Sequence, residues 1–209
     1  MRIDVWMDVV CPWCFIGKTR LDRALAQAGI ASEVEVIYRS YRLSPERIVG
    51  TAPLIDKMAA FGMGREVARQ RIARSTAAAA ADGLIFYPGD RVVGDTTMAH
   101  RVLHLARERG LQRPVLENFL RRHFMENHSL FDATALAALS QEAGLDGAEV
   151  TAMLAGDDYA PEVEQEDREG HGIVREGVPT FVFDRRLMLS GSQPIEAFLA
   201  AFAQMSPAE

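Results

Sequence analysis

The order of local patterns near the N-terminus is the strongest constraint on the fold of this chain. Residues 3–10 are rich in β-branched and aromatic side chains, which is typical of a buried strand. Pro12 then opens a stretch with apolar residues at near-helical spacing that ends at Gly29, and residues 34–41 return to strand character. This order predicts a right-handed crossover between two parallel neighbours in one sheet.

A long helical stretch separates these elements from the C-terminal ones. The pattern is almost wholly helical from Pro53 to Gly172, and it includes an alanine-rich run over 77–81 that Gly83 is expected to end. Further helices are predicted over residues 96–109, 114–126, 132–143 and 147–154.

Strand character returns near the C-terminus. Residues 178–184 and 187–190 predict two strands joined by a tight turn over 184–186, and a closing helix follows over 194–204. The predicted fold class is α/β: a β-α-β and β-β-α sheet domain interrupted by a large all-helical insertion. We expect the sheet domain to combine residues 1–52 with 173–209, and the helical insertion or lid to span 53–172.

Composition excludes several classes of protein. The 209 residues are 48% hydrophobic and 25% charged, and no apolar run approaches the roughly 20 residues of a membrane span, so we expect no membrane association. A net charge of −6 argues against nucleic-acid binding, which needs clustered cations. Asp4 and Asp8 interrupt the only N-terminal apolar stretch, so it does not resemble a secretory signal and we expect a cytoplasmic protein.

Cys11 and Cys14 are the only cysteines of the chain, in the sequence Cys-Pro-Trp-Cys at the start of the first predicted helix. Positions three apart on a helix have Cα atoms roughly 5.5 Å apart, which a disulfide accepts, so the pair can open and close with little backbone movement. Such a small ring removes little entropy from the unfolded chain. The spacing therefore favours reversible chemistry over a structural staple.

The two thiols are predicted to have different roles. Cys11 is expected at the beginning of the helix, where free N–H groups and the helix dipole lower a thiol pKa from about 8.5, so it is the predicted nucleophile. Cys14 lies one turn inward and is expected to resolve the mixed disulfide. Pro12 fits the first turn because it loses no helical hydrogen bond. Trp13 either shapes the contact surface or packs against the helical stretch.

A metal site is the weaker interpretation of these cysteines. Structural zinc takes four ligands, and the chain has no second Cys-x-x-Cys pair. His100 and His104 share one helix face, but the proline and tryptophan between the cysteines are explained by redox chemistry and not by zinc. We therefore expect no metal and no bound cofactor.

Several motifs together resemble the DsbA-family, FrnE-like thiol oxidoreductases of the thioredoxin superfamily, and the resemblance spans nearly the whole chain. The most specific is Asp-Val-Val-Cys-Pro-Trp-Cys-Phe-Ile-Gly-Lys over residues 8–18. The others lie at residues 39–45, 96–101, 177–183 and 190–194.

The resemblance implies further site residues. Pro179, which opens the third predicted strand, is expected to be cis and to face Cys11, and Val178 and Thr180 beside it are expected to contact an extended substrate. His100 resembles a position that lines the groove, although a partly exposed helix residue explains it equally well. Asp8 is either a proton relay for Cys14 or, as we favour, a turn carboxylate.

Thiol–disulfide exchange on protein or peptide substrates is the predicted function, with Cys11, Cys14 and Pro179 as catalytic residues and glutathione as a possible redox partner. The resemblance also includes kappa-class glutathione transferases and 2-hydroxychromene-2-carboxylate isomerases. These imply an alternative, a glutathione-dependent isomerase or transferase acting on a small aromatic or polyketide-like molecule. Retention of Cys14 favours exchange, because only exchange needs two sulfurs. A third alternative is a chaperone-like binder that uses the groove near Trp13.

Overall fold

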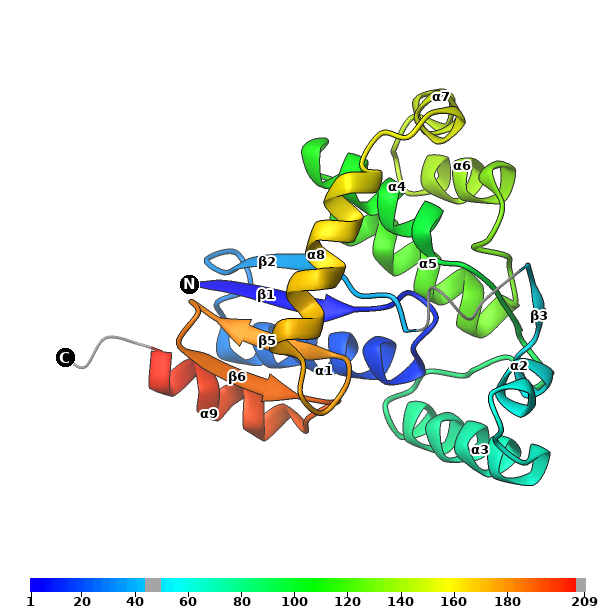
Figure 1. Cartoon of the computed structure of the whole chain (residues 1–209). Coiled ribbons are helices and arrows are strands. Elements are labelled where there is room, and N and C mark those ends of the chain that lie inside the picture. The colour runs from blue at the N-terminus through cyan, green and yellow to red at the C-terminus, as the bar shows by residue number, and fades with distance from the viewer. Residues whose placement is uncertain (44–49, 206–209) are drawn as a thin grey trace.

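Two segments far apart in the sequence build the central sheet. The structure, a computed structural model, describes residues 1–43 and 50–205. Its four-stranded sheet has the order β2-β1-β5-β6, and β1 runs parallel to β2 and antiparallel to β5 (Figure 1). The four strands are β1 Arg2–Met7, β2 Glu35–Ser40, β5 Thr180–Phe183 and β6 Leu187–Ser190.

The predicted crossover is confirmed, with shorter strands than expected. α1 (Pro12–Ala28) connects β1 to β2 and ends at Gly29, whose φ of 71° suits glycine. β1 stops at Met7 because the chain then turns, and the Cys11 N–H donates to the Asp8 carbonyl oxygen at 3.1 Å. β5 begins only at Thr180, since Pro179 has no N–H to donate to the sheet.

Helices cover both faces of this sheet. α1 and α9 (Ile195–Met205) lie on one face, where Phe181 of β5 meets Phe198 of α9 edge to face with ring centroids 4.9 Å apart. α8 (Ala160–Ile173) crosses the opposite face (Figure 1). The chain therefore has a three-layer core, with the sheet in the middle.

The predicted helical stretch gathers beyond the end of the sheet to which β1 points (Figure 1). The alanine-rich run is the last turn and a half of α3, and Gly83 follows it with a φ of 73°, as expected. The helices here are α2 Leu54–Ala60, α3 Arg65–Ala81, α4 Thr97–Glu108, α5 Gln112–Glu126, α6 Ala133–Glu142 and α7 Gly147–Ala155.

One part of this stretch is not helical. β3 (Ala52–Pro53) and β4 (Val92–Val93) form a small antiparallel pair, which the sequence analysis missed because a two-residue strand is too short to show alternation. β3 spans the predicted boundary between residues 52 and 53, and its partner β4 lies inside the predicted insertion. The division into two domains stays a prediction. Ser44 and Pro45, at one predicted motif, lie outside the described residues.

A buried carboxylate joins the helical stretch to the sheet. Glu166 of α8 accepts hydrogen bonds from the Ser40 N–H and from the guanidinium groups of Arg39 and Arg107, and it lies 3.2 Å from Nε2 of His104. Burial alone would raise the pKa of Glu166, but His104, the Ser40 N–H and Arg39 outweigh it and hold the pKa well below its usual range. This network fixes α8 and α4 against β2.

Within the described ranges, no helix is long and apolar enough to cross a membrane.

Candidate active site

The two cysteines occupy the first turn of α1, as predicted. Cys11 is the N-cap residue with extended φ and ψ of −86° and 114°, and Pro12 follows as the first helical residue. The Cys14 N–H donates to the Cys11 carbonyl oxygen at 3.0 Å. Both side chains are free thiols. The sequence folds this way because proline tolerates a helix start and the Asp8 turn directs the chain into it.

The local environment distinguishes the two thiols. Both thiols are buried, but Cys11, 4% exposed, lines a cleft, and Cys14, 1% exposed, does not. Burial raises the pKa of the Cys14 thiol well above its ordinary value, and the hydrogen bond with Cys11 and the charge of Cys11 raise it further. Cys14 therefore remains protonated at neutral pH until its neighbour reacts.

The Gly177–Pro179 loop faces the cysteines from the far end of the sequence. The Val178–Pro179 peptide bond is cis, and Sγ of Cys11 lies 3.7 Å from the Val178 carbonyl oxygen. Thr180 is fully buried, and its hydroxyl donates to the Gly177 carbonyl oxygen at 2.9 Å. Val178 thus lines the cleft, while Thr180 holds the loop from beneath and is not among the residues that line the cleft.

Gly17 is a site residue that the sequence analysis missed. A Cβ atom at this position would lie 2.8 Å from Cγ of Pro179 and 3.2 Å from Cζ of Phe181, so only glycine lets α1 approach the loop this closely. The available signal was a glycine in the interior of an amphipathic helix, which usually has a packing reason.

The cleft beside Cys11 has a volume of about 390 Å³ and lies between the α1 start, α2 and α3. Pro12 and Trp13 line one side, and apolar side chains such as Met58 and Phe61 line the other. The guanidinium of Arg74 lies 6.0 Å from the Trp13 ring, so Trp13 both shapes the cleft and contacts α3.

Asp8 and His100 form a buried pair behind the cysteines. Oδ2 of Asp8 accepts the Leu43 N–H at 2.8 Å, so the carboxylate binds a distant backbone segment and does not cap the α1 turn. Oδ1 lies 3.4 Å from Nε2 of His100, and neither of these two atoms has a hydrogen-bond partner in the structure. His100 is 1% exposed and does not line the cleft. Its interpretation as a partly exposed helix residue is therefore wrong, because α4 turns this face into the core.

His104, on the same face of α4, is bound to Ser40 and Glu166 and lies apart from the cysteines. In the part of the chain that the structure describes, no three His, Cys, Asp or Glu side chains are arranged to hold a metal ion.

Comparison with known proteins agrees with this geometry. A family profile described as the DSBA-like thioredoxin domain matches residues 2–203, which is nearly the whole chain. The chain belongs to this family. It is therefore a DsbA-like member of the thiol oxidoreductases, and the thioredoxin-like fold expected from the sequence is confirmed.

Solved structures support the same assignment. A probable DsbA oxidoreductase from Streptomyces coelicolor is 40% identical, with a TM-score of 0.90 over 100% of this chain and 93% of the other. The cytosolic disulfide reductase DsbM from Pseudomonas aeruginosa, with GSH, is 18% identical, with a TM-score of 0.67 over 98% and 100% of the two chains. A 2-hydroxychromene-2-carboxylate isomerase is 14% identical, with a TM-score of 0.73 over 98% and 96%. The last two show a shared fold.

Proposed function

We propose that this DsbA-like protein exchanges thiols and disulfides on peptide or protein substrates through Cys11 and Cys14. The observation that carries the proposal is the asymmetry of the pair: Cys11 lies in a cleft at the N-terminus of α1, and Cys14 lies behind it with a raised pKa. Cys11 also precedes the first turn of α1, whose N–H groups have no partners within the helix. This difference supports Cys11 as the nucleophile and Cys14 as the resolving thiol.

The reaction proceeds in two steps. The Cys11 thiolate attacks one sulfur of the substrate disulfide, forms a mixed disulfide and releases the first substrate thiol. The Cys14 sulfur then attacks Cys11, which closes the Cys11–Cys14 disulfide and releases the second thiol. The substrate gains two electrons and the protein loses two; the reverse sequence oxidises a dithiol. The Val178 backbone, with Pro179, aligns the substrate segment beside Cys11.

Cys14 must lose its proton in the second step, and Asp8 is the candidate acceptor. Asp8 is 1% exposed, and its negative charge raises the pKa of Cys14, which indicates that the two groups are close. Among the described residues, its Oδ1 has no hydrogen-bond partner. His100, 3.4 Å from that oxygen, would hold the carboxylate in place and share the proton.

We further propose that the protein works in the cytoplasm as a reductase or isomerase, with glutathione as a possible recycling thiol. The structural similarity to DsbM, a cytosolic disulfide reductase with GSH, supports this compartment and partner. A second function, glutathione-dependent isomerisation of a small molecule, is supported by the fold shared with the chromene isomerase and by the mostly apolar cleft.

Single-turnover exchange separates the two functions. The reduced protein is mixed with a peptide disulfide, quenched with acid and analysed by mass spectrometry. We expect Cys11→Ser to abolish exchange and Cys14→Ser to accumulate the mixed disulfide at Cys11. Turnover of a chromene carboxylate with glutathione that survives Cys14→Ser, without any mixed disulfide in that variant, would favour the isomerase instead.

A further inference from the structure

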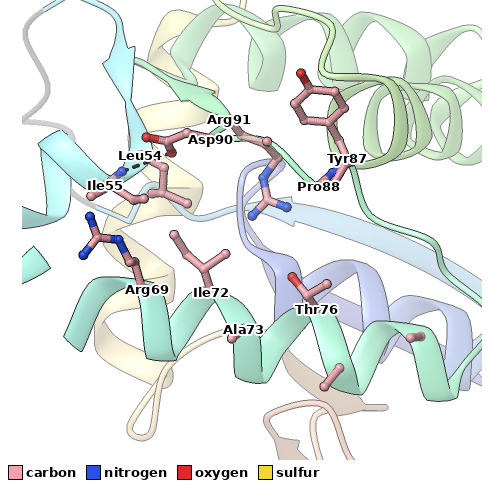
Figure 2. A pocket seen from close by; sticks show the side chains of 13 residues that line it. Leu54, Ile55, Arg69, Ile72, Ala73, Thr76, Tyr87, Pro88, Asp90 and Arg91 are labelled. Carbon is pink, nitrogen blue, oxygen red and sulfur yellow. Dashed lines mark hydrogen bonds between the residues drawn. The ribbon is translucent and has the colours of Figure 1, made fainter. Parts of the chain in front are cut away.

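Arg91 lies in a wall that separates the active-site cleft from a second hollow. This second hollow has a volume of about 560 Å³ and lies between α3 and the loop over residues 87–91 (Figure 2). Leu54, Ile72 and Arg91 line both hollows. The Arg91 carbonyl oxygen accepts the Leu54 N–H at 2.7 Å, which fixes the backbone from which the guanidinium reaches inward.

Among the residues that the structure describes, the Arg91 guanidinium has no anionic partner. Arg91 is 4% exposed, yet no carboxylate among the described residues lies within ion-pair distance, and its side chain donates no hydrogen bond within that part of the chain. It packs instead over the rings of Phe86 and Phe124, at 5.4 and 4.6 Å. The neighbouring Asp90 carboxylate turns away and accepts the Ile55 N–H at 3.3 Å (Figure 2).

Other buried cations of this protein are satisfied internally. Lys18 is 2% exposed and pairs with Asp22 and Glu117 at 2.6 and 3.0 Å, and Arg101 donates to three backbone carbonyl groups. Burial lowers the pKa of Arg91 to about 10, and the charge of Asp90 opposes this only in part. Arg91 is therefore a cation at neutral pH, and the described part of the chain offers it no anion of the kind that a buried charge requires.

The described lining of the cleft carries unmatched basic residues, although the chain has a net charge of −6. Arg71 and Arg91 line it, and no described lining residue is acidic. The basic residues beside Cys11 therefore have the opposite sign to the net charge of the chain. A lining of this kind favours a negatively charged ligand.

We propose that Arg91 binds a carboxylate of the substrate, so that the protein prefers peptide thiols and disulfides with an acidic residue beside the cysteine. This inference rests on the proposed function. The substrate sulfur meets Cys11 at one side of the cleft, and the carboxylate reaches Arg91 at the wall shared with the second hollow. A planar guanidinium accepts a carboxylate with two parallel hydrogen bonds, and the apolar surroundings strengthen them.

Equilibrium binding tests this without any exchange chemistry. A fluorescent pentapeptide with serine in place of cysteine, carrying Glu or Gln next to it, is titrated against the Cys11→Ser, Cys14→Ser double variant. We expect the Glu peptide to bind about 10- to 100-fold more tightly. Arg91→Met should remove the preference, Arg91→Lys should retain part of it, and Arg121→Met should leave it intact, since Arg121 is exposed on α5 and lines neither hollow.

Equal affinity for the two peptides, or a preference that survives Arg91→Met, would overturn the inference. Circular dichroism shows whether Arg91→Met folds. If it does not, the role of Arg91 is decided by the affinities of the Glu and Gln peptides for the double variant and for the same protein carrying Arg91→Lys. An acidic tripeptide compared with the same sequence inside an unfolded protein distinguishes a small peptide ligand from a protein segment.

Single-turnover exchange keeps the two proposals separate. The same peptides, with their cysteine joined to a neutral pyridinethiol, react with the reduced protein; Cys11 takes the peptide sulfur and pyridinethiol leaves. If neither peptide reacts, the proposed function fails, while the binding result still decides the role of Arg91. If both react at one rate, exchange stands and the Arg91 inference is wrong.

Discussion

Replacing Gly17 with alanine tests whether the close packing of α1 on the Pro179 loop is required for exchange. The new Cβ would lie 2.8 Å from Cγ of Pro179, whereas carbon atoms prefer about 3.5 to 4.0 Å, so the loop or the helix must retreat by roughly 0.7 Å. The proline ring is rigid, and Phe181 at 3.2 Å blocks sideways movement of the methyl group. The loop that we propose aligns the substrate beside Cys11 is therefore displaced.

The expected effect on stability is small. Overpacking costs about 1 to 3 kcal/mol, and alanine regains about 1 kcal/mol of helix propensity, which leaves a loss of about 0 to 2 kcal/mol in the free energy of unfolding. The effect on catalysis should be larger, because misplacing reacting groups by about 1 Å can cost about 100-fold in rate. We expect Gly17→Ala to slow single-turnover exchange at least about tenfold.

Two measurements isolate the cause. Alkylation of Cys11 by iodoacetamide should stay within about twofold of the wild-type rate, because this small reagent does not need the loop. Gly172→Ala is the matched control, because Gly172 lies in α8 and no described atom lies within 4 Å of where an alanine Cβ would be. This variant should gain about 1 kcal/mol in the free energy of unfolding and leave the exchange rate unchanged. An exchange rate for Gly17→Ala equal to that of the wild type would refute the proposed role of this packing.

Two further variants test the buried carboxylates. Asp8→Asn should leave formation of the mixed disulfide nearly unchanged but slow its resolution by about 100-fold, because Cys14 loses its proton acceptor. Both rates are measured by acid quenching and mass spectrometry. Equal slowing of both steps would contradict a role of Asp8 in deprotonating Cys14. Glu166→Gln should cost about 3 kcal/mol at pH 7 in urea unfolding, because Arg39 and Arg107 lose their shared partner. Since folding depresses the Glu166 pKa, this stabilisation is present above its ordinary value of 4.5 and declines at lower pH; a variant with the same acid sensitivity as the wild type would argue against it.

Much of the fold could be predicted because its determinants are local. The β-branched and aromatic run over residues 3–10 predicts one strand. Pro12 at a helix start and Gly29 after it bound one helix, and the order of these elements specifies the crossover. The β3–β4 pair could not be predicted, since two residues per strand have no periodicity and the pairing depends on tertiary contacts.

The site was predictable where its residues are adjacent in sequence or belong to a motif that the family resemblance links to them. Cys11 to Cys14 form one turn, and the resemblance connected this turn to the Val178–Pro179 bond. Three features of the site depend on contacts with elements far away in sequence, which a local pattern does not show. They are the close packing at Gly17, the burial of His100 and, within the described residues, the lack of an anionic partner for Arg91.

An equilibrium redox titration of Cys11 and Cys14 against glutathione and dithiothreitol buffers, followed by Trp13 fluorescence, measures the proposed chemistry most directly. Trp13 lies between the two sulfurs in sequence and lines the cleft, so its emission should report closure of the disulfide. We expect one reversible two-electron transition between about −120 and −270 mV, absent in Cys14→Ser. If no intramolecular disulfide forms in any buffer, the dithiol does not exchange, and a glutathione-dependent activity at Cys11 alone would take its place.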